Sequence, residues 1–199
     1  MSEFDSRARV WDKDKIHLER SEALAIELQR MIPIQHEMKA MEYGAGTGLL
    51  SFLLKDMFSE ITLMDSSREM IEVCKEKTAY FNTRHITPLW FDLEHTDYDG
   101  KFDLIFNQMV LHHVNDIDLI FEKFYTLLNP EGYLAIADLY PEDGSFHGLE
   151  VKVHWGFDPQ ELTTRLKKHG FKTVEFKESF RMKRESGRIY PIFLLVAQK

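Results

Sequence analysis

Apolar residues along the chain follow two alternating spacings. Short apolar runs bounded by turn residues predict buried strands, and stretches with apolar residues three or four positions apart predict amphipathic helices. The predicted strands cover residues 38–43, 60–65, 87–91, 102–107, 133–139, 171–176 and 190–197. The predicted helices cover residues 16–31, 49–57, 67–81, 116–128 and 158–170.

This alternation of strand and helix sets the fold class. It predicts a mostly parallel sheet with helices on both faces and right-handed crossovers. The link between the last two strands is too short for a crossover helix, so these strands are expected to pair antiparallel. We therefore expect an α/β fold: a single-domain, doubly wound, Rossmann-like sheet of seven strands with an antiparallel last strand. The domain covers residues 1–199, with an N-terminal helical segment at 1–36 and a substrate-side loop at 141–157.

Composition narrows the classes of partner and compartment. The 199 residues carry 25 Lys and Arg against 33 Asp and Glu, a net charge of -8, which disfavours binding to nucleic acid or to an anionic membrane. The start of the chain is highly charged and no run reaches 18 apolar residues, so neither a signal peptide nor a membrane span is predicted. The lone Cys74 excludes an internal disulfide and fits a reducing compartment. We expect a cytoplasmic protein.

The most specific motif is the turn after the first strand, Glu42-Tyr43-Gly44-Ala45-Gly46-Thr47-Gly48. Glycines let the backbone approach a ligand closely, and the start of the next helix offers free N–H groups, so the turn fits a nucleotide-like cofactor. A dinucleotide site would require a glycine at position 49, which is Leu; this disfavours a nicotinamide-dependent oxidoreductase. Asp65 ends the second strand, where a carboxylate can accept both hydroxyl hydrogens of a ribose.

Two further segments give these features a family resemblance. The glycine turn, Asp65, Asp92-Leu93 and the stretch Asp103-Leu104-Ile105-Phe106-Asn107 resemble the successive motifs of class I S-adenosylmethionine-dependent methyltransferases, over about residues 38–140. The resemblance implies S-adenosylmethionine as cofactor and S-adenosylhomocysteine as product. It implies cofactor contacts by Trp11, Gly44, Ala45, Gly46, Asp65, Ser66, Asp92, Leu93, Asn107 and Gln108.

The resemblance also divides these contacts by role. Gly44 and Gly46 would pack under the methionine part of the cofactor, and Asp65 would hold the ribose. Asp92 would accept the adenine amino group, while Asn107 and Gln108 would line the methionine end. Trp11 lies before the first predicted helix, in the segment that folds over the cofactor in small members of the family.

No single catalytic residue is predicted. Methyl transfer is an in-line displacement that depends mainly on alignment, and only a poorly acidic nucleophile needs a general base. The candidates for such a base are His113, His147 and His154, which are expected at the carboxyl-end face of the sheet. We interpret the neighbouring His112 as a packed or capping residue. Because the spacing of the histidines does not repeat, no metal site is predicted.

Two segments are candidates for the acceptor site. The stretch from Phe146 to Phe157 contains His147, His154 and Trp155 and is typical of a binding loop, although its aromatic residues would equally plug the edge of the core. The link between the last two strands is bracketed by Arg181, Lys183, Arg184 and Arg188. Arg184 would there bind a carboxylate or phosphate of the acceptor, unless the hairpin is simply a solvated edge whose charges oppose aggregation.

The sequence therefore predicts a single methyltransferase domain that acts on a small-molecule acceptor, with no nucleic-acid or membrane partner. The basic final segment makes an anionic acceptor compatible with the overall negative charge. Two alternatives stay open: a nicotinamide-dependent oxidoreductase and a non-catalytic subunit that binds S-adenosylmethionine.

Overall fold

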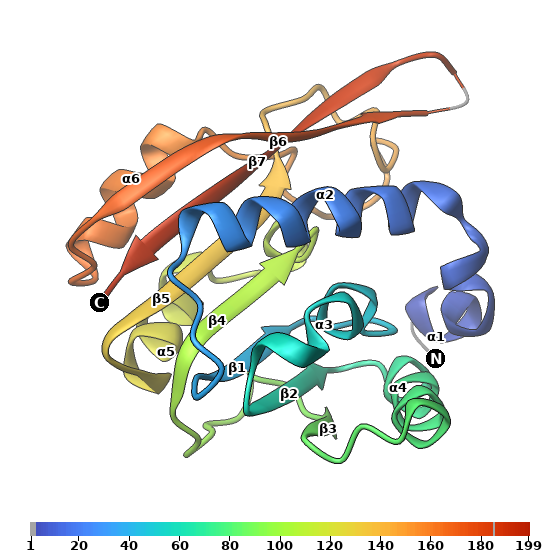
Figure 1. The fold of residues 1–199 in the computed structure, drawn as a ribbon. Coiled ribbons are helices and arrows are strands. Elements are labelled where there is room, and N and C mark those ends of the chain that lie inside the picture. Colours follow the sequence, from blue (N-terminus) through green and yellow to red (C-terminus); the bar gives the residue numbers. More distant parts are fainter. Residues whose placement is uncertain (1–2, 185) are drawn as a thin grey trace.

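A single mixed sheet organises the protein (Figure 1). The computed structural model describes residues 3–184 and 186–199. Over these residues the strand order is β3-β2-β1-β4-β5-β7-β6, and β7 runs antiparallel to both of its neighbours. The strands are β1 (Lys39–Tyr43), β2 (Glu60–Asp65), β3 (Ile86–Trp90), β4 (Phe102–Gln108), β5 (Leu128–Leu139), β6 (Val174–Lys183) and β7 (Ile189–Gln198). The predicted fold class is confirmed.

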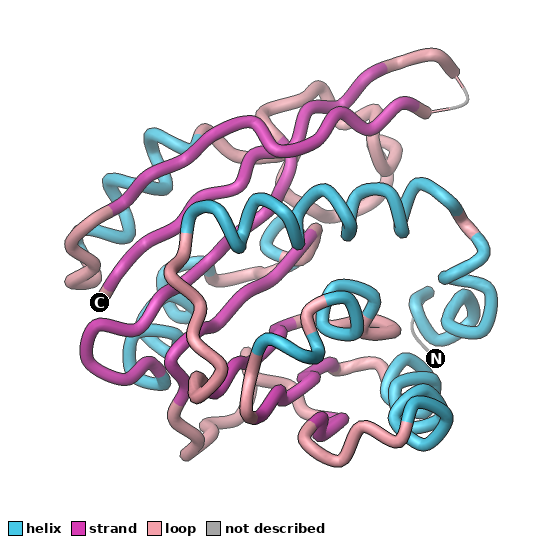
Figure 2. Tube along the Cα trace, in the orientation of Figure 1, coloured by secondary structure: helices cyan, strands magenta, loops and turns pink. Residues whose placement is uncertain are grey.

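Helices cover both faces of this sheet (Figure 2). One face packs against α2 and α3 and the Cys74 side of α4, and the other packs against α5 and α6. The helices are α1 (Glu3–Arg7), η1 (Ala8–Lys13), α2 (Lys15–Met31), α3 (Leu49–Leu53), η2 (Lys55–Met57), α4 (Arg68–Phe81), η3 (Leu111–His113), α5 (Ile117–Leu127) and α6 (Pro159–Lys168). No helix in the described part of the chain is both long and apolar enough to cross a bilayer.

Side-chain alternation along β4 decides what reaches each face. Leu104 and Phe106 are buried in the core under α2, while Ile105 is buried in the core under α5. Because successive side chains of a strand point to opposite faces, Gln108 belongs to the α2 face and Asn107 to the α5 face. The two residues that follow each other at the end of β4 therefore enter different environments.

The sheet differs from the sequence prediction mainly at its ends. The strand predicted at 171–176 begins only at Val174 and continues to Lys183, and it forms a long hairpin with β7. Most of β6 is exposed and polar, so the apolar pattern that predicts strands is missing from its second half. The helix predicted at 49–57 is divided into α3 and η2. At the N-terminus, α1 and η1 precede α2 and lie beside α4 (Figure 1).

Candidate active site

A cavity of about 240 Å³ opens where the carboxyl ends of β1, β2 and β4 meet. From β1 the chain adds β2 and β3 toward one edge of the sheet, and it then adds β4 and β5 on the other side of β1, toward the opposite edge. Doubly wound folds bind ligands at the point where the strand order reverses in this way. The cavity brings together most of the residues that the sequence singled out: Trp11, Gly44, Ala45, Gly46, Asp65, Ser66, Asp92, Leu93, Gln108, His113, His147 and Arg184.

The glycine turn requires glycine for its backbone conformation and, at Gly44, for want of space. Gly44, Gly46 and Gly48 have φ of +65°, +55° and +75°, a region that L side chains rarely adopt. A Cβ on Gly44 would lie 2.5 Å from the side chain of Val110. The turn therefore holds a bare stretch of backbone at the cavity wall.

Asp65 connects this turn to the start of α4. One of its carboxylate oxygens accepts the backbone N–H of Gly46 at 2.7 Å, and the other accepts the N–H of Ser67 at 2.7 Å. Burial raises the pKa of Asp65 above its usual value, although the two N–H donors oppose this effect. At the end of β3, Asp92 accepts the N–H of Glu94 at 3.1 Å and also contacts a ring nitrogen of His95.

The N-terminal segment forms the outer wall of the cavity. Trp11 faces the cavity and stacks on His17, with 4.2 Å between ring centroids. Asp12 fixes the segment in place because its carboxylate accepts hydrogen bonds from Thr47 at 2.5 Å and from Lys77 at 3.0 Å. The segment is thus attached both to the glycine turn and to α4.

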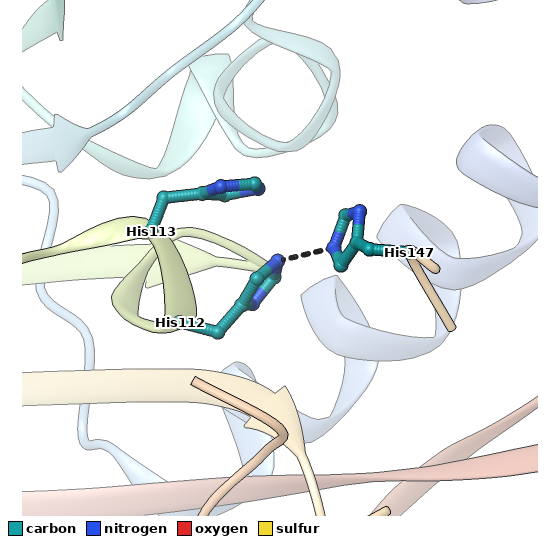
Figure 3. A group of neighbouring side chains, drawn as sticks. All are labelled: His112, His113 and His147. Atoms are coloured by element: carbon teal, nitrogen blue, oxygen red, sulfur yellow. Dashed lines mark hydrogen bonds between the residues drawn. The ribbon is translucent and has the colours of Figure 1, made fainter. Parts of the chain in front are cut away.

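Three histidines meet at another part of the cavity wall (Figure 3). His112 and His113 belong to η3, directly after β4, and His147 comes from the loop after β5. His112 is buried; its Nδ1 lies 2.7 Å from Asp138 and its Nε2 lies 3.0 Å from Nε2 of His147. Burial lowers the pKa of His113 to about 3 and that of His147 to about 4, and charge on His112 adds to both effects.

Asn107, His154 and Trp155 do not line the cavity. Asn107 is buried on the α5 face by the alternation of β4. His154 instead attaches the loop after β5 to η3: its Nε2 donates to the carbonyl of Val114 at 3.0 Å, and its backbone N–H donates to the carbonyl of His112 at 2.8 Å. Trp155 is 46% exposed. Phe157 of this loop enters the core and Phe146 packs against the core, so the alternative interpretation, in which Trp155 and Phe157 both plug the edge of the core, holds for Phe157 and not for Trp155.

The basic residues of the last hairpin separate into two environments. Arg184 lines the cavity and lies over the ring of Phe146, 4.3 Å from its centroid. Arg188 instead pairs with Asp143 at 2.8 Å, and Arg181 pairs with Glu178 at 2.6 Å. Only one arginine of the predicted cluster therefore contributes to the site.

Sequence reasoning missed a second arginine, Arg20 of α2. It is 5% exposed and lines the cavity, where its Nε donates to Gln108 at 3.4 Å. Burial lowers its pKa to about 10, opposed by the charge of Asp138. Arg20 lies four positions before Leu24 and eight before Leu28, both of which are buried. A charged residue within the apolar stripe of α2 is therefore the sequence signal that could have identified Arg20 as a site residue.

Known proteins resemble this chain in sequence and in fold. A family model described as a methyltransferase domain matches residues 16–176. An uncharacterized methyltransferase of Schizosaccharomyces pombe is 30% identical over 155 residues, which cover 69% of this chain and 55% of the relative. The malonyl-[acyl-carrier protein] O-methyltransferase 1 of Ilyobacter polytropus is 31% identical over 99 residues, covering 49% of this chain and 36% of the relative. The chain thus spans about half or less of the length of these curated relatives.

Among solved structures, the fold recurs at full length. It is found in the complex between the Haloferax volcanii Trm112 methyltransferase activator and a methyltransferase, with a TM-score of 0.80 and 19% identity. That match covers 100% of this chain and 98% of the other. At this level of identity the likeness extends to the fold.

Proposed function

The chain belongs to the class I S-adenosylmethionine-dependent methyltransferases, and from this membership we propose that it transfers a methyl group to a small, anionic acceptor molecule. One observation carries the nature of the acceptor. Three arginines line the same cavity as the glycine turn: Arg7, which lies over the ring of Trp11, Arg20 and Arg184. In the described part of the chain, neither Arg20 nor Arg184 forms an ion pair with a carboxylate.

The residues at one part of the cavity suit the cofactor. A Cβ on Gly44 would clash with Val110, so glycine leaves bare backbone in this part of the cavity wall, which a cofactor can approach closely. We infer that Asp65 holds the ribose hydroxyls and that Asp92 and Leu93 lie against the adenine, with Trp11 closing the cavity. When bound, S-adenosylmethionine supplies a methyl group already activated by a sulfonium. The protein then has to align the acceptor with that group and exclude water.

Arg20 and Arg184 give the cavity its preference for an anion. Each lowers the cost of binding a negative charge, and the charge of Arg184 adds to the effect of burial in lowering the pKa of Arg20. Arg20 is buried and Arg184 is half-buried, and a bound carboxylate or phosphate would offset the cost of removing their charge from water. The planar guanidinium suits either anion through paired hydrogen bonds.

A matched pair of variants tests the acceptor class. The acceptor panel consists of carboxylates and phosphate esters that carry a hydroxyl, amino or thiol group, each beside its neutral amide or alcohol counterpart. We expect S-adenosylhomocysteine release with anionic members only. Arg184→Gln is expected to raise the KM for the acceptor about 10- to 100-fold, since a charge-assisted hydrogen bond contributes about 1.5–3 kcal/mol.

Arg188→Gln is the control, because it removes the same charge from the same hairpin but from an ion pair with Asp143. Its KM for the acceptor is expected to equal that of the unmodified protein. Equal turnover of neutral and anionic acceptors, or equal effects of the two substitutions, would contradict the proposal. Binding of S-adenosylmethionine without turnover of any acceptor would instead support a non-catalytic subunit.

A further inference from the structure

The three histidines of the cavity wall have the arrangement of a metal site. Each of His112, His113 and His147 offers one ring nitrogen, and these nitrogens all lie within 4.8 Å of one another. The three rings converge from two separate segments (Figure 3). Nitrogens bound to one tetrahedral Zn²⁺ at about 2.0–2.1 Å lie about 3.4 Å apart. The separations between these nitrogens would have to shorten by at most about 1.4 Å for all three to bind one ion.

The most buried of the three is already oriented by an outer partner. Asp138 is fully buried, and its Oδ1 lies 2.7 Å from Nδ1 of His112 while its Oδ2 accepts the backbone N–H of His112 at 3.2 Å. In the neutral form of His112 whose Nδ1–H is accepted by this carboxylate, the lone pair is left on Nε2, on the side of His147. A carboxylate behind a histidine is the usual outer partner of a metal ligand.

The third ring is not explained by hydrogen bonding. His112 and His147 contact each other through Nε2 atoms at 3.0 Å, and this pair alone could be a simple hydrogen bond. His113, however, makes only ring contacts: its centroid lies 4.2 Å from that of His112 and 5.0 Å from that of His147. Across the described residues its ring nitrogens have no hydrogen-bond partner. A shared ion would satisfy all three rings.

The ligand set indicates which ions would bind. Imidazole suits Zn²⁺ and other first-row transition metals, whereas Mg²⁺ and Ca²⁺ require oxygen ligands. All three histidines line the cavity, so a fourth coordination position would face it. Three protein ligands with one open position are the arrangement of catalytic zinc rather than structural zinc.

We propose that His112, His113 and His147 bind a divalent first-row transition metal, Zn²⁺ or one of similar chemistry, whose open position faces the acceptor. The placement of the acceptor at the open position of the ion rests on the proposed function. A hydroxyl or amino group of the acceptor that coordinates the ion would lose its proton to solvent more readily. Its negative group would meanwhile meet Arg184, which lines the same cavity. The spacing of these histidines along the chain does not indicate a metal site, because the ligands come from segments that meet only in the folded protein.

Metal binding can be measured without any activity assay. The full chain is stripped with a chelator and titrated with Zn²⁺ against a chromogenic chelator, and Co²⁺ is added separately to record its visible absorption. We expect one Zn²⁺ per chain and the intense absorption of tetrahedral Co²⁺. Asp138→Asn is expected to weaken Zn²⁺ binding about 10- to 100-fold, and loss of a ligand in His147→Ala or His113→Ala to weaken it more.

His169→Ala is the control, because His169 pairs with Asp118 at 3.1 Å and does not line the cavity. It is expected to bind Zn²⁺ with unchanged affinity, and thermal melts check that each variant is folded. Absence of Zn²⁺ binding, or binding that survives both His113→Ala and His147→Ala, would overturn the inference. S-adenosylmethionine is titrated into the same stripped protein. Binding of S-adenosylmethionine without binding of Zn²⁺ refutes the metal site alone. Binding of Zn²⁺ without binding of S-adenosylmethionine refutes the proposed function alone.

Discussion

Replacement of the buried Glu42 by Gln is expected to change how the stability of the protein depends on pH. Glu42 is fully buried at the end of β1; its Oε2 accepts hydrogen bonds from the hydroxyl of Ser51 at 2.5 Å and from its N–H at 3.2 Å. Its Oε1 is buried without a partner among the described residues. Burial raises the pKa of Glu42 to about 7, although Ser51 and Lys77 oppose the shift.

The sign and size of the effect follow from this pKa. The folded chain keeps a proton on Glu42 up to about pH 7, whereas an ordinary glutamic acid loses it near 4.5. The stability that depends on this group is therefore fully present below pH 4.5 and is lost as the pH rises through 7. At about 1.4 kcal/mol per pH unit, the loss amounts to about 3 kcal/mol. Glutamine, which does not ionise, avoids it.

Urea unfolding between pH 4.5 and 8 measures this effect. The free energy of unfolding of Glu42→Gln, minus that of the unmodified protein, is expected to rise by about 3 kcal/mol across the range. Glu60→Gln is the control, since Glu60 is exposed on the neighbouring strand and paired with Lys39. Its difference is expected to show no comparable rise. A difference for Glu42→Gln that stays constant with pH would refute the reasoning.

Three further substitutions or treatments give distinct outcomes. Gly44→Ala is expected to lower the free energy of unfolding in urea by about 1–3 kcal/mol more than Gly187→Ala. Both glycines have positive φ, but only at Gly44 would the new Cβ lie against Val110. Equal losses of stability in the two variants would refute the clash with Val110. Asp65→Asn is expected to weaken S-adenosylmethionine binding about 10- to 100-fold in calorimetry, by loss of a charged acceptor, and unchanged affinity would remove Asp65 from the cofactor site. Burial raises the pKa of the Cys74 thiol, so this thiol is expected to react with a colorimetric thiol reagent only after unfolding; rapid reaction of the folded chain would contradict the packing of α4.

The features that the sequence predicted well are local ones. The glycine turn is readable because positive φ at Gly44 and Gly46 and the strand and helix on either side all depend on neighbouring residues. The alternation of apolar spacings likewise fixed the mostly parallel sheet and its antiparallel last strand. Each of these inferences depends on residues that are neighbours in the sequence, taken one segment at a time.

The features that the sequence missed depend on residues far apart in the chain. His112 is bound to Asp138 and meets His147, and nothing in the spacing of these three positions indicates that they touch. Arg20 becomes part of the site because α2 crosses the sheet above Gln108. Burial of a polar side chain is decided by such tertiary contacts, which composition and periodicity do not record.

The central claim, that the cavity beside the glycine turn binds S-adenosylmethionine, is tested most directly by calorimetric titration of the full chain with S-adenosylmethionine and, separately, with NAD. Both ligands contain an adenosine, but only the first is expected to match the turn that has Leu at position 49. We predict saturable binding of one S-adenosylmethionine per chain and no measurable heat from NAD. Saturable binding of NAD with no binding of S-adenosylmethionine would contradict the claim.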